Sequence, residues 1–261
     1  MTQSNYKPPI VLVIGGHDPS GAGIQADIET CNAMKCYPVS IVTCTTNQNL
    51  KNLICVSSCL TSEVLATIDT ALEEFSPNAC KLGMIGSSDL AIGLGQLIQK
   101  KLKSIPIVVD PILAAGSGKN IADQELIDAY LKYIFPQATI ATPNFDELCK
   151  LGGSPDSKDS ISSILESGCQ ALLATDIKPQ HPKITNYLYR SEKKSLYYEM
   201  ARYQGLYHGT GCTLSSGIAA QLALGEDIET AIKKAQKFTH LAVKRAINFG
   251  LSQKIPNRLN Q

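Results

Sequence analysis

The chain has 261 residues, of which 44% are hydrophobic and 18% charged, and its formal net charge is +1. The near-neutral charge gives no reason to expect a nucleic-acid partner, and the length suffices for one large or two small domains with a substantial core. The longest apolar run near the start, residues 10–14, is too short for a signal sequence or a membrane span. We therefore expect a cytoplasmic protein without a membrane partner.

Nine cysteines are present, an odd number with scattered spacings. Cys55 and Cys59 form the one close pair, and neither a C-x-x-C motif nor a histidine at ligand spacing indicates a zinc site. Most of the cysteines are expected to pack as small apolar side chains in a reducing compartment. Cys212 differs from the rest because of the motif in which it lies.

Short apolar runs alternate with helical patterns along the chain. Seven runs are apolar on both faces and predict strands buried in a parallel sheet, at residues 10–14, 39–44, 54–57, 80–83, 107–110, 139–142 and 171–174. Apolar residues at helical spacing predict helices over residues 62–75, 123–135, 212–224 and 227–249. The last two of these helices are separated by Gly225.

One section departs from this alternation. Residues 184–190 and 195–200 are tyrosine-rich runs joined by a short polar turn, which predicts an antiparallel hairpin at a sheet edge. The repeated β-α-β units elsewhere predict an α/β fold with a mostly parallel central sheet and helices on both of its faces. No internal repeat, low-complexity segment or linker interrupts the pattern, so we expect a single domain over residues 1–261.

The most informative stretch is His-Gly-Thr-Gly-Cys-Thr at residues 208–213, which is followed by the apolar run 214–220. Its two glycines allow a tight turn just where a helix begins, so unpaired N–H groups point outward there. Together with the positive end of the helix dipole, these groups form an anion site. The Cys212 thiol lies where it could contact the group that accepts the phosphate. The stretch therefore predicts a phosphoryl-transfer site that does not use the standard phosphate loop.

Polar side chains follow several predicted strands, at the sheet edge where ligands of open α/β sheets bind. Asp27 either accepts hydrogen bonds from a ligand or acts as a helix carboxylate, and Gln48 either contacts the edge of a heterocycle or forms a turn. Asp110 suits hydrated Mg²⁺ or a transferring phosphate, with a capped strand end as the alternative. Asn144 and Glu147 are spaced as a capping box, and the same two side chains could hold magnesium waters.

Two further patterns do not indicate nucleotide motifs. Gly-Lys-Asn at residues 118–120 resembles the end of a Walker A loop, but residue 120 is neither serine nor threonine. The Gly-x-Gly at residues 209–211 resembles the start of a dinucleotide fingerprint, but residue 214 is leucine, so a dinucleotide dehydrogenase is the weakest alternative. His17 and His208 adjoin glycine turns, and we interpret them as local hydrogen-bonding groups rather than general bases.

Taken in order, these segments resemble the hydroxymethylpyrimidine/phosphomethylpyrimidine kinases of thiamine biosynthesis, members of the ribokinase-like superfamily. The matching segments are residues 16–27, 48–49, 81–84, 110–111, 142–144 with Glu147, and 208–215. Sugar kinases of the superfamily usually carry aspartate where this chain has Cys212. The resemblance implies a three-layer α/β/α sandwich that transfers the γ-phosphate of ATP, with Mg²⁺, first to a 5-hydroxymethyl group and then to the resulting monophosphate. It also suggests a homodimer.

The resemblance further implies roles for individual residues. The pyrimidine site would be lined by Gly16, Ala22, Asp27, Gln48, Met84, Ile112 and Cys212. Within it, Asp27 and Gln48 would contact the amino-pyrimidine edge, while Met84 and Ile112 would sandwich the ring. The anion hole would be formed by Gly209, Thr210, Gly211 and Cys212. ATP would be bound by Asn144 and Thr175, and the metal by Asp110 and Glu147.

Three positions depart from the family pattern. Gly21 stands alone where the family commonly has two glycines, Gly116 replaces a common lysine, and residues 174–177 replace a segment with a Gly-Gly turn beside the nucleotide. These departures motivate one alternative, a degenerate and non-catalytic pyrimidine-binding protein. The nearest alternative is a pyridoxine/pyridoxal kinase, which shares the fold and the loop. We also expect the helix N-terminus to lower the pKa of the Cys212 thiol.

Overall fold

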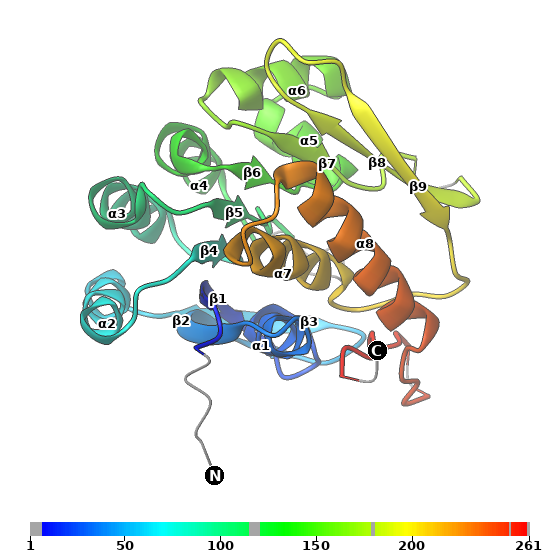
Figure 1. Cartoon of the computed structure of the whole chain (residues 1–261), viewed down its shortest axis with the longest axis horizontal. Helices are drawn as coiled ribbons and strands as arrows, with labels where there is room; N and C mark the ends of the chain where they lie inside the picture. The colour runs from blue at the N-terminus through cyan, green and yellow to red at the C-terminus, as the bar shows by residue number, and fades with distance from the viewer. Residues whose placement is uncertain (1–6, 115–120, 179–180, 251, 260–261) are drawn as a thin grey trace.

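The computed structural model describes residues 7–114, 121–178, 181–250 and 252–259. Within these ranges, nine strands form one sheet in the order β3-β2-β1-β4-β5-β6-β7-β8-β9 (Figure 1). The strands are β1 (Ile10–His17), β2 (Tyr37–Gln48), β3 (Leu53–Ser58), β4 (Ala79–Leu82), β5 (Ile107–Val109), β6 (Ile140–Ala141), β7 (Leu172–Ala174), β8 (Lys183–Tyr189) and β9 (Leu196–Ala201). Neighbours from β2 through β7 pair in parallel, whereas β3, β8 and β9 pair antiparallel at the two edges. The predicted mostly parallel sheet with an antiparallel edge hairpin is confirmed.

Helices cover both faces of the sheet, which confirms the three-layer arrangement (Figure 1). One face carries α1 (Gly23–Ala33), α7 (Thr210–Ala223) and α8 (Ile228–Lys244). The other face carries α2 (Thr61–Glu74), α3 (Ser88–Leu97), α4 (Gln124–Ala129), α5 (Phe145–Gly152) and α6 (Ser157–Glu166). Short π and 3-10 turns continue α3 and α4, at Ile98–Leu102, Tyr130–Ile134 and Phe135–Gln137.

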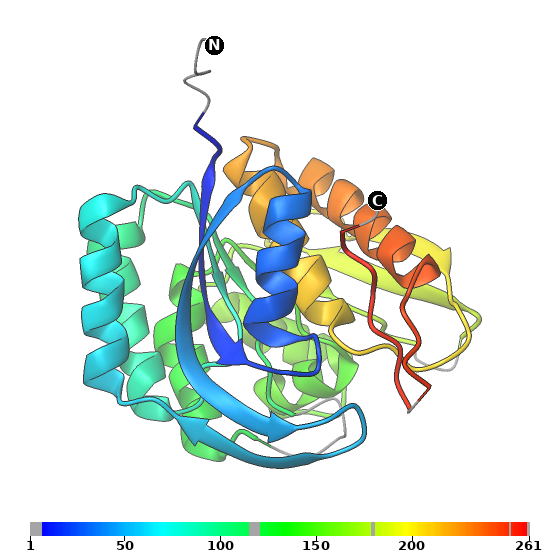
Figure 2. The ribbon, with the colours of Figure 1, turned by 90° about the horizontal axis from the view of Figure 1, so that it is seen from below.

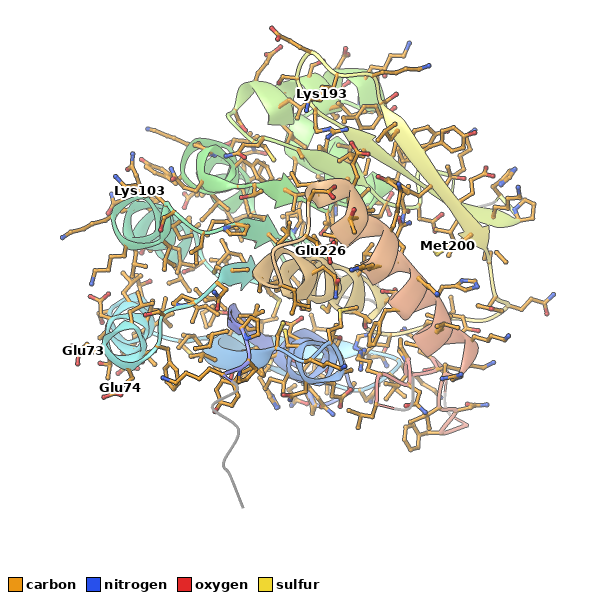
Figure 3. All side chains as sticks on the ribbon, in the orientation of Figure 1. Glu73, Glu74, Lys103, Lys193, Met200 and Glu226 are labelled. Atoms are coloured by element: carbon orange, nitrogen blue, oxygen red, sulfur yellow. The ribbon has the colours of Figure 1, made fainter. Side chains whose placement is uncertain are left out.

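The strands divide their side chains between two cores, because successive residues of a strand point to opposite faces. In β1, Leu12 and Ile14 pack in the core beneath α2 to α6, whereas Val11 and Val13 pack in the core beneath α1, α7 and α8. Charged side chains such as Glu73 of α2 extend outward from the periphery of the molecule (Figure 3). The same alternation decides which face of the sheet receives each polar residue in a strand.

The prediction of a buried parallel strand at residues 54–57 is wrong. β3 pairs antiparallel with β2, and most of its residues are exposed. Residues 49–52 alone connect the two strands, which is enough for a hairpin but far too short for a parallel crossover. Figure 2 shows this hairpin as a long, curved ribbon. Its length places Gln48 at the end of β2 instead of in the loop beyond a shorter strand.

Two helix predictions also need correction. α8 ends at Lys244 instead of residue 249, because the chain then turns back and Ile247 pairs with Ile255. The predicted helix over residues 123–135 is a regular α-helix only to Ala129 and continues as π and 3-10 turns. Among the described helices, none is long and apolar enough to cross a membrane.

Gly95 of α3 lies against the chain near Tyr133 without room for a side chain. A Cβ atom at Gly95 would overlap the backbone oxygen of Tyr133, and only movement of the backbone could relieve that contact. We expect Gly95→Ala to lower the free energy of unfolding by about 1–3 kcal/mol, although alanine has the higher helix propensity. Urea denaturation followed by circular dichroism measures this difference.

Gly93→Ala, in the same helix, is the matched control. A Cβ atom at Gly93 would meet a methyl carbon of Leu65 at 2.8 Å, on a side chain that can rotate away. Its stability should remain within about 1 kcal/mol of the wild type. Equal losses in the two variants would show that the contact with Tyr133 is not the cause.

Candidate active site

A cavity of ≈ 310 Å³ opens at the carboxyl ends of the parallel strands, beside the N-terminus of α7. Every predicted site residue except Asp27 lines it: Gly16, Ala22, Gln48, Met84, Asp110, Ile112, Asn144, Glu147, Thr175, Gly209, Thr210, Gly211 and Cys212. The sequence analysis assigned no role to most of the other lining residues, which are Asp18, Gly23, Thr46, Leu53, Ala114, Ile121, Thr142, Leu206, Tyr207, His208 and Gln253. The volume lies in the range that is usual for small-molecule sites.

The anion loop forms as the motif predicts. Gly209 is the N-cap of α7 and adopts the left-handed conformation (φ 85°), which a residue with a side chain rarely takes. Thr213 donates its backbone N–H to the Gly209 oxygen at 3.0 Å. The N–H groups of Thr210, Gly211 and Cys212 precede this bond and belong to the first helical turn, which has no intrahelical acceptors for them. These three residues line the cavity, so its end at α7 presents backbone N–H groups of the kind that bind anions.

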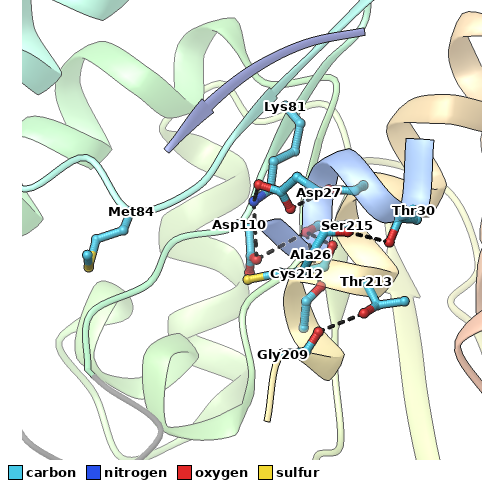
Figure 4. A network of polar contacts seen from close by, with 12 residues as sticks. Ala26, Asp27, Thr30, Lys81, Met84, Asp110, Gly209, Cys212, Thr213 and Ser215 are labelled. Atoms are coloured by element: carbon cyan, nitrogen blue, oxygen red, sulfur yellow. Dashed lines mark hydrogen bonds and ion pairs between the residues drawn. The ribbon is translucent and has the colours of Figure 1, made fainter. Parts of the chain in front are cut away.

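A buried ion cluster lies beside this loop (Figure 4). Lys81 of β4 has no exposed side-chain surface, and its Nζ lies 2.9 Å from Asp27 Oδ2 and 3.9 Å from Asp110 Oδ2. Strand alternation explains the direction of Lys81, because Ala79 packs in the core beneath α1 and α7 and Lys81 follows it on the same face. Burial opposes the charged lysine, but the two carboxylates outweigh it and raise the pKa of Lys81. The cluster thus keeps a cation next to Cys212.

The structure corrects the role expected of Asp27. This residue of α1 is fully buried, and its two carboxylate oxygens accept hydrogen bonds from Lys81 Nζ and from Ser216 Oγ, the latter at 2.6 Å. Without exposed surface and with both oxygens engaged, Asp27 anchors Lys81 and does not face the cavity. Lys81 lies in a segment that resembles the family, but no role was predicted for the lysine. A charged residue within an otherwise apolar strand was the available signal.

The Cys212 thiol is protonated at neutral pH. Burial raises its pKa to about 12, and the neighbouring carboxylates of Asp110 and Asp27 add to the effect against the charge of Lys81. The expectation that the helix N-terminus lowers this pKa is therefore wrong, because desolvation outweighs the helix dipole. The Gly23 backbone beside the thiol acts in the opposite direction, but it does not offset the burial.

Asp18 joins the first glycine loop to the anion loop. Its Oδ2 lies 2.5 Å from Nε2 of His208, and its Oδ1 accepts from the Ser20 N–H at 2.6 Å. Burial opposes ionisation, but these hydrogen bonds outweigh it and lower the pKa of Asp18. The sequence pattern indicated the loop but not this carboxylate. His208 is a hydrogen-bonding group, as expected, but its partner lies 190 residues away in the chain and is not local.

The capping box at the start of α5 is confirmed. Asn144 Oδ1 accepts from the Glu147 N–H at 2.9 Å, and Glu147 Oε2 accepts from the Asn144 N–H at 3.0 Å. Burial and the charge of Asp110 nevertheless raise the pKa of Glu147 to about 8. Burial also raises the pKa of Asp110.

Asp110 and Glu147 both line the cavity, and burial raises the pKa of each carboxyl group. The charge of Asp110 also disfavours the ionisation of Glu147, and a divalent cation bound there would relieve that repulsion. In the described part of the chain, no three His, Cys, Asp or Glu side chains gather as a metal site. Mg²⁺ is usually held by one or two carboxylates together with substrate phosphates and water, so the two side chains present match that mode.

The chain has no glycine directly after β7, and Asp176 there adopts a left-handed conformation (φ 48°), which aspartate tolerates better than most residues. Arg202 holds the Asp176 carboxylate with two hydrogen bonds. Thr175 donates its N–H to the Pro143 oxygen at 2.8 Å and thereby lies beside Asn144. Gly116 and the Gly-Lys-Asn at residues 118–120 lie outside the described residues.

The raised pKa of Glu147 predicts a pH dependence of stability. A carboxyl group whose pKa rises from its ordinary 4.5 to about 8 on folding binds its proton more tightly in the folded state. Its contribution to stability is therefore complete below the unfolded-state pKa and is lost as pH rises toward 8. As pH rises from about 5 to 8, the free energy of unfolding of the wild type should therefore fall relative to that of Glu147→Gln. The expected slope is up to about 1.4 kcal/mol per pH unit.

Urea denaturation in metal-free buffer at several pH values tests this expectation. Glutamine retains the capping box, so the two proteins differ mainly in the titrating group. Glu63→Gln is the control, because Glu63 also lies in the first turn of a helix but is exposed. Parallel stability curves for the wild type and Glu147→Gln would contradict the assignment.

The chain is similar to known kinases both in sequence and in structure. A family model described as phosphomethylpyrimidine kinase matches residues 18–257. The chain is 30% identical over 256 residues to a hydroxymethylpyrimidine/phosphomethylpyrimidine kinase of Staphylococcus aureus, covering 94% of this chain and 91% of that protein.

Solved structures show the same likeness. The phosphomethylpyrimidine kinase of Clostridium difficile superposes with a TM-score of 0.76 at 28% identity, covering 91% of this chain and 100% of that one. An ADP complex of Bacillus subtilis pyridoxal kinase superposes with a TM-score of 0.85 at 26% identity, covering 97% and 99%. The family model matches most of the chain, and the chain is 30% identical to the S. aureus kinase. The chain therefore belongs to the phosphomethylpyrimidine kinase family.

Proposed function

We propose that the protein transfers the γ-phosphate of ATP to the hydroxymethyl group of 4-amino-5-hydroxymethyl-2-methylpyrimidine, and then a second phosphate to the monophosphate, as a step of thiamine biosynthesis. One observation carries this proposal: a single cavity is lined both by apolar side chains that can hold an aromatic ring (the ring slot: Ala22, Met84, Ile112 and Cys212) and by the anion loop of residues 209–212. Family membership and the names of the bacterial relatives support the choice of substrate.

The ring slot is bounded by apolar side chains. Ala22 and Cys212 belong to a small buried cluster against which Ile112 packs, and Met84 lines the same cavity. Gln48 lines the same cavity and lies near Asp18. We infer that its amide N–H would donate to Asp18, and that its amide oxygen would then accept a hydrogen bond from an exocyclic amine. Asp18 would thus orient the ring-contacting amide, in place of the direct contact expected of Asp27.

The end of the cavity beside the N-terminus of α7 suits a nucleoside triphosphate, the phosphate donor. The N–H groups of residues 210–212 would stabilise the charge of the transferring phosphoryl group, and Asn144 and Thr175 lie together on the adjacent wall. Asp110 and Glu147 would hold Mg²⁺, which, when bound, neutralises charge on the phosphates. The ADP complex of the structurally similar pyridoxal kinase supports ATP as the donor.

The buried thiol is better suited to orienting the acceptor than to deprotonating it. With its pKa raised to about 12, Cys212 holds its own proton. Its sulfur can accept a hydrogen bond from the substrate hydroxyl and aim the oxygen at the phosphorus. In a loose transition state the hydroxyl needs little deprotonation before the P–O bond forms, so positioning and charge stabilisation supply most of the rate.

Pyridoxal is the second candidate acceptor, because the pyridoxal kinase of B. subtilis superposes over nearly the whole chain. Purified protein with ATP and Mg²⁺ should be offered hydroxymethylpyrimidine, its monophosphate and pyridoxal in parallel. We expect the highest kcat/KM with the two pyrimidines. A preference for pyridoxal would overturn the assignment, and tight pyrimidine binding without turnover would identify a non-catalytic binding protein.

Replacement of Cys212 should separate the two half-reactions. In Cys212→Ala we expect kcat for hydroxymethylpyrimidine to fall by about tenfold or more, because the neutral hydroxyl loses the group that orients it. Phosphorylation of the monophosphate should fall less, because that acceptor is already ionised and meets the anion loop directly. Steady-state kinetics with each acceptor measure the effect, with Cys36→Ala, a buried cysteine outside the cavity, as the control. Equal losses in both half-reactions would refute this role.

A further inference from the structure

Arg258, near the end of the chain, has no exposed side-chain surface and is the largest fully buried residue described. Burying an unpaired guanidinium is costly, so a buried arginine must be matched by acceptors on all sides. The position of Arg258 is therefore held by specific partners, and these partners indicate what the residue does.

The guanidinium contacts four groups, two of which belong to loops of the active site. Its Nη2 donates to the Gly21 oxygen at 2.9 Å and to the Gly209 oxygen at 3.3 Å. Its Nε donates to Thr213 Oγ1 at 2.8 Å, and its Nη1 pairs with Glu29 Oε2 at 3.0 Å. One side chain thus joins the first glycine loop, the anion loop, α1 and α7.

The C-terminal tail carries Arg258 to this place by backbone pairing. The His208 N–H donates to the Lys254 oxygen at 2.9 Å, and Lys254 donates back to the Leu206 oxygen at 2.9 Å. Farther along, the Asn257 N–H donates to the Ala242 oxygen at 3.0 Å. The tail therefore runs beside the segment that leads into the anion loop and is tied to α8 before it reaches Arg258.

Arg258 acts from behind the cavity wall. Gly21 precedes Ala22, which lines the ring slot, and Gly209 opens the anion loop, but Arg258 itself is not among the lining residues. A Cβ atom at Gly209 would lie 2.6 Å from Nη2 and 2.8 Å from the Gly21 oxygen, so the two loops and the guanidinium are in close contact. The positive charge of Arg258 lies at the N-terminus of α7, where it opposes the helix dipole. The negative charge of Glu29 offsets the charge of Arg258.

We propose that Arg258 is a positioning residue for phosphoryl transfer, which fixes the spacing between the ring-side loop at Gly21 and the anion loop at Gly209. Because one nitrogen, Nη2, donates to both carbonyl oxygens, the two loops keep one separation. The acceptor hydroxyl bound against the first loop then meets the phosphate bound at the second. This inference rests on the proposed kinase function but not on which acceptor is used.

Three variants separate the contacts of Arg258. Arg258→Lys keeps a cation but cannot reproduce the planar set of donors. We expect its kcat to fall by about tenfold or more, with smaller changes in both KM values, because a misplacement of about 1 Å is costly in the transition state. Arg258→Ala should lose at least as much, and guanidinium ions at low millimolar concentration should restore part of its kcat. Glu29→Gln leaves both carbonyl bonds in place and should keep kcat within about threefold of the wild type.

Arg190→Lys is the matched control, because Arg190 also forms a part-buried pair with a glutamate, Glu229, but lies away from the cavity. Rates are compared at a temperature at which every variant is folded, and thermal unfolding is recorded beside them. If Arg258→Lys lowers the melting temperature while its kcat matches that of Arg190→Lys, Arg258 is only structural and the proposal fails. A loss of kcat in Glu29→Gln equal to that in Arg258→Lys would also overturn it. Arg258→Lys decides the question if Arg258→Ala does not fold.

The wild type distinguishes failure of this inference from failure of the proposed function. Turnover of pyridoxal alone would refute the pyrimidine assignment, and the variants would then be compared with pyridoxal as acceptor. If the wild type phosphorylates no acceptor, the proposed kinase function fails, and the positioning role, which rests on it, fails with it. If the wild type is active and Arg258→Lys keeps its kcat, only the positioning role fails.

Discussion

Lys81 lies between Asp27 and Asp110 where β4, β5, α1 and α7 meet, and the geometry of the active site depends on this interaction. The ammonium group has no contact with solvent, so the two carboxylates provide the compensation for its burial. Removing one member of such a group leaves an uncompensated buried charge, which costs about 3–5 kcal/mol. The cluster therefore holds Asp110 at the cavity and α7 against the sheet at the same time.

Burial then determines the chemistry of the groups around this cluster. Cys212 and Glu147 lie at the cavity wall with raised pKa values, because little water solvates their charged forms. Asp18, at the same wall, has a lowered pKa because hydrogen bonds from His208 and Ser20 outweigh its desolvation. The site thus combines a protonated thiol, an ionised carboxylate at Asp18, and two buried carboxyl groups, Asp110 and Glu147, whose pKa values are raised. Charge stabilisation and orientation are what such a set provides for phosphoryl transfer.

The elements that the sequence predicted correctly are those set by local patterns. The apolar run at residues 107–110 and the capping pair of Asn144 and Glu147 form as expected, because periodicity and side-chain capping act over a few residues. The strand at residues 54–57 was assigned the wrong environment, since an apolar run does not reveal the direction of its neighbour. The end of α8 was missed because the pairing of Ile247 with Ile255 competes with a helical pattern that would otherwise continue.

The sequence by itself determined the anion loop, the polar residues at strand ends and the family to which they belong, because spacing and residue type suffice for each. The tertiary structure alone decided that Asp27 pairs with Lys81 while Asp18 pairs with His208 at the cavity, because the sequence shows two carboxylates nine residues apart without their partners. It also decided the protonation of Cys212 and the burial of Arg258 behind Gly21 and Gly209. These properties depend on desolvation and on contacts between residues far apart in the chain, and neither is encoded in a local pattern.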